Sequence, residues 1–329
     1  MMEEVFSFKA NGETLSGILN LPEGGERPEL GIIFANAGAR GRLGSTFQYP
    51  YYARTLAERG IASLRFDPHG IGDSTGEIPI SEMPAFYGSL QAGRFAADLD
   101  AAINAFWERV APKKLVLWGV CGGAITALIA AGRRAEVQGV VLLSVPVLLD
   151  SAEQSEEDTL SAGYAREYLL QAYGKKFLSP KSWARLFSGK SEMKTIVSYS
   201  RVALKGLLGK GKELLRDSVW GVRGRLFGAV VTTPRVGHGA ERHPMFNEHF
   251  LESLDMMMEG ERRVLCIFGE GDAIRWHFQE HFVEPFWQDD PRYETQCEVH
   301  YLPGCNHLFT LREWQDQALE LAGPWLDRV

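Results

Sequence analysis

The chain carries the unbroken run Leu115-Val-Leu-Trp118, Gly119-Val-Cys-Gly-Gly123 and Ala124-Ile-Thr-Ala-Leu-Ile-Ala-Ala-Gly132. An apolar run, a glycine-rich pentapeptide and a segment of small residues follow one another, which predicts a strand, a tight turn and a helix. This order is that of a nucleophile elbow, in which the nucleophile sits on a strained turn between glycines. Cys121 occupies the nucleophile position, where serine is the usual residue.

The residues around Cys121 meet the physical requirement of such an elbow. The neighbours of a strained nucleophile must be nearly free of side chains, as Gly119, Gly122 and Gly123 are. The predicted helix starts behind the turn, so its free N–H groups and its positive dipole end favour a thiolate and, later, an oxyanion. The alternative is that Cys121 is a small buried apolar residue. Candidate catalytic partners occur later in the chain, in the order nucleophile, acid, histidine, and this order favours a nucleophile over a buried apolar residue.

A candidate acid follows the predicted buried strand 263–268. Asp272 ends the segment Gly269-Glu-Gly-Asp272, and catalytic groups of open α/β sheets gather at the C-terminal ends of the strands. We therefore take Asp272 as the acid. Asp150, beyond the apolar run 139–145, is the second candidate and Glu270 the third. The structural alternative for Asp272 is a turn or helix N-cap.

The candidate base lies in the loop after the predicted last strand, residues 297–302. The loop Pro303-Gly-Cys-Asn-His307 joins that strand to a predicted closing helix over residues 311–321. A histidine in this loop can reach back over the sheet to the elbow. Of the eight histidines only His307 has this placement, so we expect it to be the general base.

A second donor to an oxyanion is expected in the loop after an early strand, residues 30–34. That loop, Ala35-Asn-Ala-Gly-Ala-Arg-Gly-Arg42, is rich in small residues that let the backbone approach a substrate oxygen. We expect the N–H groups of Gly38 and Gly122 to form the oxyanion hole. The alternative is a glycine-rich turn without a ligand.

Two further histidines are candidate metal ligands. His277 and His281 are four residues apart on a predicted helix, so they can share a helix face and could bind a metal. No further cluster at metal-like spacing accompanies them in the sequence. We expect both to be partly buried structural residues, and we expect neither a metal nor a cofactor.

Four segments together resemble the α/β-hydrolase superfamily along nearly the whole chain. They are Asp67-Pro-His-Gly-Ile-Gly-Asp-Ser74, Gly119-Val-Cys-Gly-Gly123, Gly269-Glu-Gly-Asp272 and Gly304-Cys-Asn-His307. Within the superfamily, the chain looks like the hydrolases that accompany exosortase systems and exopolysaccharide clusters, which share the cysteine elbow. Their helical insert carries a stretch similar to Tyr168-Leu-Leu170 and Ser179-Pro-Lys-Ser-Trp183. Dienelactone hydrolase is a more distant relative with a cysteine nucleophile, and it lacks so large an insert.

These patterns predict an α/β-hydrolase fold, with a mostly parallel central sheet, helices on both faces and a helical cap. Residues 1–149 and 256–329 are expected to form the core, and residues 150–255 the cap. We expect a hydrolase of esters or thioesters that uses Cys121, His307 and Asp272 and an acyl-cysteine intermediate. The alternatives are an acyltransferase with the same triad and a non-catalytic binding protein on a hydrolase fold.

The composition is that of an ordinary soluble globular protein, with 45% hydrophobic and 23% charged residues among 329. No stretch approaches 18 consecutive apolar residues, and the opening Met1-Met-Glu-Glu4 lacks an apolar signal region. Four irregularly spaced cysteines suggest thiols in a reducing compartment. We therefore expect a cytoplasmic protein, either free or peripheral to the inner face of the membrane.

The predicted cap has an unusual charge. Between Lys175 and Arg225 there are thirteen Lys or Arg residues and three acidic ones, in a chain of net charge −7. One interpretation is a solvated helical face; another is a contact surface for an acidic protein, such as an acyl carrier, or for an anionic membrane. Nucleic acid is not expected, because no recognition motif is present and the rest of the surface would repel phosphate.

Overall fold

The computed structural model describes residues 1–24, 27–36, 38–78, 83–149, 165, 199–202, 204 and 242–329. The chain divides into two compact units. The first comprises Met1–Ala152, Arg242–His281 and Asp290–Val329, and the second comprises Glu153–Glu241 and Phe282–Asp289. The predicted cap falls largely outside the described residues, so the cap and its boundaries stay predictions.

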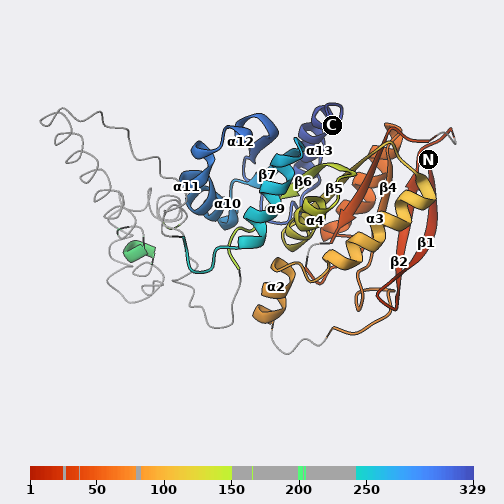
Figure 1. Ribbon diagram of the computed structural model, residues 1–329, viewed down its shortest axis with the longest axis horizontal. Coiled ribbons are helices and arrows are strands. Elements are labelled where there is room, and N and C mark those ends of the chain that lie inside the picture. Colours follow the sequence, from red (N-terminus) through yellow and green to blue (C-terminus); the bar gives the residue numbers. More distant parts are fainter. Residues whose placement is uncertain are drawn as a thin grey trace, which may run out of the picture. The chain divides into compact units, whose positions relative to one another are not determined.

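An eight-stranded sheet forms the centre of the first unit, in the order β1-β2-β4-β3-β5-β6-β7-β8 (Figure 1). The strands are β1 (Met2–Ala10), β2 (Glu13–Leu21), β3 (Leu30–Ala35), β4 (Ala62–Phe66), β5 (Lys114–Val120), β6 (Val137–Leu143), β7 (Arg263–Gly269) and β8 (Cys297–Leu302). The pairs β1–β2 and β2–β4 are antiparallel, and all pairs from β4 through β8 are parallel. The predicted mostly parallel sheet is confirmed, and β1 and β2 form an antiparallel hairpin at one of its edges.

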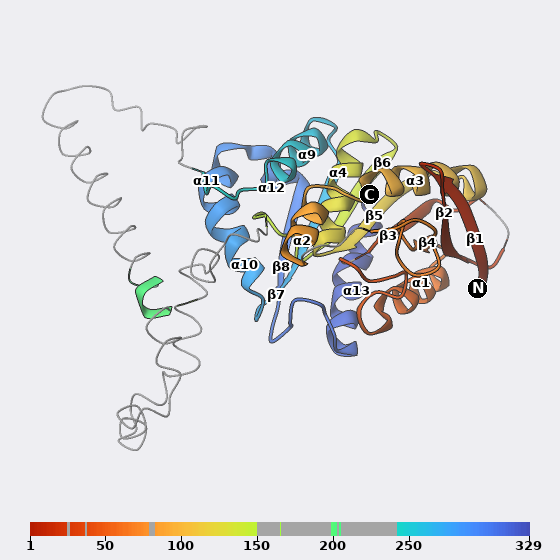
Figure 2. The ribbon, with the colours of Figure 1, turned by 90° about the horizontal axis from the view of Figure 1, so that it is seen from below.

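Helices cover both faces of this sheet (Figure 2), as predicted. α1 (Gln48–Glu58) and α13 (Arg312–Leu326) lie on one face. The other face carries α3 (Ala96–Val110), α4 (Gly122–Arg133) and α9 (Glu248–Glu259), with α2 (Met83–Gln91) packed against α4. The shorter helical segments are the 3-10 turn Ser45–Phe47, α10 (Ala273–Phe278), the π-helical turn Gln279–Val283, α11 (Glu284–Phe286), the 3-10 turn Trp287–Asp289 and α12 (Pro291–Gln296).

The central strands are apolar because both of their faces are covered. Every residue of β3 and β4 is buried, which is typical of parallel strands between two helical layers. An aromatic cluster fills the face under α1, where Phe34 stacks on Tyr49 with ring centroids 5.1 Å apart. Tyr52 lies against Trp118 at the same centroid distance of 5.1 Å. This cluster supports β3, which ends at the predicted oxyanion loop, and β5, which ends at the elbow.

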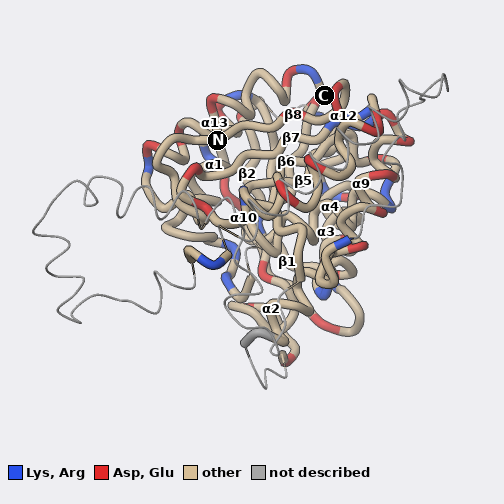
Figure 3. Tube along the Cα trace, turned by 90° about the vertical axis from the view of Figure 1, so that its left-hand side faces the viewer, with Lys and Arg blue, Asp and Glu red and all other residues tan. Residues whose placement is uncertain are grey.

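Acidic and basic residues both occur over the described part of the chain (Figure 3). The basic stretch from Lys175 to Arg225 lies almost wholly outside the described residues, so its predicted role stays a prediction. Among the described helices, none has the length and apolar character needed to cross a membrane.

One buried arginine joins the ends of two helices. The Arg262 side chain donates hydrogen bonds to the carbonyl oxygens of Ala131, Gly132, Arg134 and Met256, which lie at or near the C-termini of α4 and α9. The last carbonyls of a helix have no partner within the helix, so a buried helix end needs such donors. Arg262 therefore fixes α4, the helix behind the elbow, to α9.

Replacement of this arginine should destabilise the fold. Arg262→Met keeps a long apolar stem but removes the charged donor from carbonyls at two helix ends, and we expect a loss of about 3 kcal/mol in the free energy of unfolding. The matched control is the half-buried neighbour Arg263→Met, which should cost less than about 1 kcal/mol. Urea unfolding followed by circular dichroism measures both. Equal losses would show that Arg262 does not join the two helices energetically.

Candidate active site

The elbow has the strained geometry that its sequence predicts. β5 ends at Val120, α4 begins at Gly122, and Cys121 between them has φ 55° and ψ −122°. A residue with a β-carbon rarely adopts a positive φ, and such strain persists where the surrounding structure enforces it. Here the Cys121 N–H donates to the Leu143 carbonyl at 2.9 Å, while the Cys121 carbonyl accepts from Ala124 N–H at 2.9 Å. The side chain of Cys121 is partly exposed.

Two glycines make this geometry possible. A β-carbon at Gly119 would lie 2.2 Å from the carbonyl oxygen of Gly123, and one at Gly123 would lie 2.4 Å from the carbonyl oxygen of Ala35. Both distances are far inside van der Waals contact. A β-carbon at Gly122 would meet its nearest neighbour, Leu90, at 3.4 Å. The close approach of α4 to β3 and β5 therefore depends on Gly119 and Gly123, whereas Gly122 has room for a methyl group.

The structure brings the predicted acid and base together. His307 Nδ1 lies 2.9 Å from Asp272 Oδ2, and Cys121 lies near enough to the imidazole to raise the pKa of His307. Asp272 is nearly fully buried, with 4% of its surface exposed. Its other oxygen, Oδ1, accepts the Ile274 N–H at 3.0 Å as the N-cap of α10. Asp272 thus serves both as the imidazole's partner and as the helix cap that was its structural alternative.

The charge state of the pair follows from its surroundings. Burial lowers the pKa of His307, but hydrogen bonds and charge interactions with Asp272 and Cys121 outweigh it and raise that pKa to about 10. Burial also raises the pKa of Asp272, yet the hydrogen bond and charge of His307 bring it below its ordinary value, with help from the nearby Ser144 hydroxyl and the Ile274 N–H. The site therefore favours a protonated imidazole beside an ionised carboxylate.

Ser144 is a site residue that sequence reasoning missed. It follows β6 directly, is fully buried, and has the strained φ of 48°. Its N–H donates to the Ile267 carbonyl of β7 at 2.9 Å, which places its hydroxyl beside Asp272. In the sequence Ser144 is the one polar residue of the apolar run 139–145, and this interruption could have identified it as a site residue.

The histidine loop is fastened to the loop that carries the acid. The Gly271 N–H donates to the Cys305 carbonyl at 3.1 Å, and the Gly304 N–H donates to Glu270 Oε2 at 3.2 Å. Glu270, the third candidate acid, is exposed and holds this loop rather than the imidazole. Asp150, the second candidate, lies outside the described residues.

The two predicted oxyanion donors lie close together. A β-carbon on Gly122 would lie 3.8 Å from the backbone nitrogen of Gly38, which has a φ of 59°. Tyr87 and Leu90 of α2 border this point, because a β-carbon on Gly38 would meet the Tyr87 ring at 3.1 Å and Leu90 at 3.8 Å. Sequence analysis did not predict α2, although Met83, Phe86, Tyr87 and Leu90 recur at helical spacing.

A buried carboxylate holds the oxyanion loop in place. Asp67 Oδ1 accepts the Arg42 N–H at 2.6 Å, and Asp67 Oδ2 pairs with the Arg42 guanidinium and accepts the Asp73 N–H at 3.1 Å. At the start of the loop, Asn36 Nδ2 donates to the Phe66 carbonyl at 2.8 Å. These hydrogen bonds from the segment Asp67–Ser74 therefore restrain the loop that contains Gly38.

A buried tyrosine packs beneath the elbow and binds the end of β3. Tyr49 is fully buried, and its hydroxyl donates to the Ala35 carbonyl at 2.7 Å. Burial, together with the nearby Cys121, raises the pKa of this hydroxyl far above its ordinary value, so it stays neutral. Tyr49 was not identified from the sequence, because its role depends on the packing of α1 against the sheet.

Three other histidines, His243, His277 and His281, form a separate cluster. The ring of His281 lies 4.8 Å from that of His243 and 6.2 Å from that of His277, measured between centroids. Burial, and to a smaller extent the two neighbouring histidines, lower the pKa of His281 to about 4. Over the described ranges, no group of three potential ligands is arranged to hold a metal ion.

Comparisons with known proteins agree with this architecture. The family model described as "Serine aminopeptidase, S33" matches residues 38–179, which include the oxyanion loop and the elbow. The esterase Pf2001 of Pyrococcus furiosus superposes with a TM-score of 0.53 at 13% identity, covering 99% of this chain and 91% of that one. Dienelactone hydrolase of Anabaena variabilis gives a TM-score of 0.51 at 15% identity, covering 99% and 97%. These likenesses show the α/β-hydrolase fold.

A sequence relative points to the same fold. The polyketide transferase GrgF of a Penicillium species is 34% identical over 109 residues, which cover 32% of this chain and 34% of the relative. The match thus spans about a third of that relative's length. The crystal structure of GrgF superposes with a TM-score of 0.51 at 18% identity, covering 99% of this chain and 97% of that one. Together with the family model over residues 38–179, these relatives support the α/β-hydrolase fold.

The elbow glycines give a stability prediction. Gly123→Ala should cost about 3 kcal/mol or more in unfolding free energy, because its methyl group would collide with backbone atoms that cannot move independently. Gly122→Ala, the adjacent control, should cost less than about 1 kcal/mol, because its methyl group meets only ordinary contacts. Urea unfolding of both variants measures the difference, and similar losses would contradict the packing described for the elbow.

The raised pKa of His307 gives a prediction for pH. An imidazole that holds its proton more tightly when folded contributes stability that is complete below its unfolded pKa of 6.5 and is lost as the pH rises through about 10. Cys121→Ala should lower the pKa of His307, because the sulfur that stabilises the imidazolium is removed. Nitrogen NMR of the imidazole measures this shift. An unchanged titration in the alanine variant would mean that Cys121 and His307 do not interact.

Proposed function

We propose that this member of the α/β-hydrolase superfamily is an ester or thioester hydrolase that works through a covalent acyl-cysteine. The observation that carries the proposal is the placement of His307, which hydrogen bonds with Asp272 and interacts electrostatically with Cys121. A base between a nucleophile and an orienting carboxylate is the arrangement that activates nucleophiles in acyl transfer. The lone partly exposed thiol at the elbow, among four cysteines of which three are buried, supports the same assignment.

The first half of the proposed reaction forms the acyl-enzyme. The Cys121 thiol passes its proton to His307, and the thiolate attacks the substrate carbonyl carbon. The carbonyl oxygen becomes an oxyanion that accepts hydrogen bonds from the N–H groups of Gly122 and Gly38. When the tetrahedral adduct collapses, the bond to the leaving alcohol or thiol breaks, and His307 returns the proton to that group. A thioester between the acyl group and Cys121 remains.

The second half releases the acyl group. Neutral His307 accepts a proton from water, and the hydroxide attacks the acyl-cysteine carbonyl, which again draws on the Gly122 and Gly38 N–H groups. Collapse of this adduct expels the Cys121 thiolate and yields the carboxylic acid. Asp272 orients the imidazole and stabilises its positive form in both halves.

The cysteine favours activated carbonyls as substrates. Sulfur leaves readily from a tetrahedral adduct, so an amine must compete with it when an amide is cleaved. We therefore propose esters and thioesters as substrates rather than peptides, although the matching family model is named for a serine aminopeptidase. We also place the chain in the cysteine-nucleophile branch that accompanies exosortase systems, on the basis of Cys121 and the segment Ser179–Trp183.

Acyl transfer is the second candidate function, and the GrgF relative favours it because that protein is a polyketide transferase. The first half of the reaction is then the same, and an acceptor hydroxyl, thiol or amine replaces water in the second. An acyl carrier or an anionic membrane surface, recognised by the basic stretch from Lys175 to Arg225, remains our proposal for the partner of either reaction.

The acyl-enzyme gives a direct test. Incubation with p-nitrophenyl butyrate should add a butyryl group to Cys121, visible by mass spectrometry of tryptic peptides, and Cys121→Ala should lose both the adduct and turnover. Cys266→Ala is the control, because burial raises the pKa of that thiol to about 12 and should keep it unreactive. Turnover by Cys121→Ala would refute the nucleophile, and a lack of any adduct would favour a non-catalytic binding protein.

The acid is tested by a pair of carboxylate variants. Asp272→Asn should reduce kcat by roughly 10³ to 10⁴, because an amide cannot stabilise the imidazolium or fix its useful tautomer. Glu270→Gln, in the same loop, should reduce kcat less than about tenfold, because Glu270 contacts only the loop backbone. The opposite ranking would reassign the acid.

A further inference from the structure

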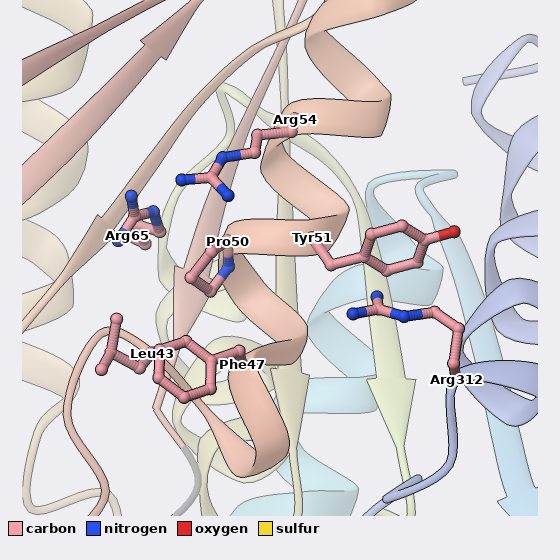
Figure 4. Close-up of a pocket in the computed structure, with 7 residues that line it drawn as sticks. All are labelled: Leu43, Phe47, Pro50, Tyr51, Arg54, Arg65 and Arg312. Atoms are coloured by element: carbon pink, nitrogen blue, oxygen red, sulfur yellow. The ribbon is translucent and has the colours of Figure 1, made fainter.

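A groove of about 290 Å³ lies on the α1 face of the first unit (Figure 4). Its walls come from the loop after β3, from α1, from β4 and from the start of α13. The residues that line it are Leu43, Phe47, Pro50, Tyr51, Arg54, Arg65 and Arg312. No step of the proposed hydrolysis uses any of them.

The groove has an excess of positive charge. Arg54 and Arg65 share one carboxylate, that of Glu3, at 3.1 and 3.2 Å. The Arg312 guanidinium carbon lies 3.5 Å from the centre of the Tyr51 ring, and no carboxylate within 4 Å pairs with Arg312 over the described residues. Three arginines therefore line this groove, and over the described residues Glu3 is the one carboxylate that pairs with any of them within 4 Å. Such a site attracts a phosphate, which guanidinium groups bind through paired hydrogen bonds.

The opposite wall of the groove is apolar and exposed. Leu43 exposes 43% of its surface and Phe47 exposes 63%, and Figure 4 shows the two side chains next to each other. Phe47 and the preceding Thr46 have positive φ values of 59° and 47°. Backbone strain in two successive residues costs free energy, and here it presents an aromatic ring that packs into no core. This wall suits an apolar arm that carries the phosphate.

The groove is built by the loops that carry the catalytic groups. The loop that contains Gly38 continues into Leu43 and Phe47, and Arg312 follows His307 by five residues. The two loops are joined beside the groove, because Thr46 Oγ1 donates to the Thr310 carbonyl at 3.2 Å and accepts from Gln315 Nε2 at 3.1 Å. A ligand in the groove would therefore touch the loops that position the oxyanion hole and the base.

We propose that the groove binds a phosphorylated, largely apolar arm on the thiol side of an acyl thioester. The Arg54, Arg65 and Arg312 guanidinium groups hold the phosphate, and Leu43 and Phe47 contact the arm. This assignment rests on the proposed function for its thioester chemistry. Its binding component does not, because a phosphorylated thiol that carries no acyl group should bind to a chain that cannot react.

The binding test uses the unreactive Cys121→Ala chain and isothermal titration with 4′-phosphopantetheine, pantetheine and inorganic phosphate. Phosphopantetheine should bind more tightly than either other probe, and Arg312→Gln should weaken it about tenfold through loss of a charged hydrogen bond. Phe47→Asn, which suits the positive φ, should weaken both phosphopantetheine and pantetheine. Arg328→Gln, an exposed arginine paired with Glu298 at the far end of α13, is the control and should change nothing.

Three outcomes would overturn the proposal. They are equal binding of phosphopantetheine and pantetheine, equal effects of Arg312→Gln and Arg328→Gln, and binding of inorganic phosphate as tight as that of the phosphorylated arm. In the reactive chain, Arg312→Gln should lower the ratio of kcat/KM for butyryl-phosphopantetheine to kcat/KM for p-nitrophenyl butyrate about tenfold. If phosphopantetheine binds but no substrate is turned over, the groove assignment stands and the proposed hydrolase is refuted. If substrate is turned over but phosphopantetheine does not bind selectively, the groove assignment is refuted and the proposed hydrolase stands.

Discussion

The site depends on one close approach, that of the first turn of α4 to the ends of β3 and β5. At this point Gly123 lies against the Ala35 carbonyl, and Gly119 lies against the Gly123 carbonyl, with no room for a β-carbon at either position. Cys121 is forced into its strained conformation between them. The same approach brings the free N–H groups at the start of α4 beside Gly38, so one packing constraint positions the proposed nucleophile and the proposed oxyanion donors.

The parallel sheet brings the remaining groups to this point. Since β3, β5, β6 and β7 are parallel, their C-terminal ends lie at one edge, and the loops that follow them meet there. Short polar contacts then connect loop to loop: Ser144 to β7, Gly271 to Cys305, and Arg42 to Asp67. These contacts limit the freedom of groups that must stay within hydrogen-bond reach of one another during a reaction.

The residues that the sequence predicted are those fixed by local pattern and chain order. Cys121 could be identified because strand, glycine turn and helix are adjacent in the chain, and Asp272 and His307 because each follows a recognisable strand. Ser144 and Tyr49 could not, because each becomes a neighbour of the site only when distant segments pack. Glu270 and Asp272 are two residues apart in the same loop, and the geometry of the folded loop, rather than sequence order, decides which of them faces His307.

In the proposed reaction, acylation of Cys121 also changes the pKa of the base, His307. The pKa of His307 is raised by two partners, Asp272 and Cys121. When Cys121 becomes a thioester, its sulfur can no longer carry a negative charge, so only Asp272 still favours the imidazolium. The pKa of His307 must then fall, because burial, which lowers it, is opposed by one partner instead of two. An imidazole that holds the thiol's proton before acylation thus becomes a neutral base for water after it, with no change in the fold.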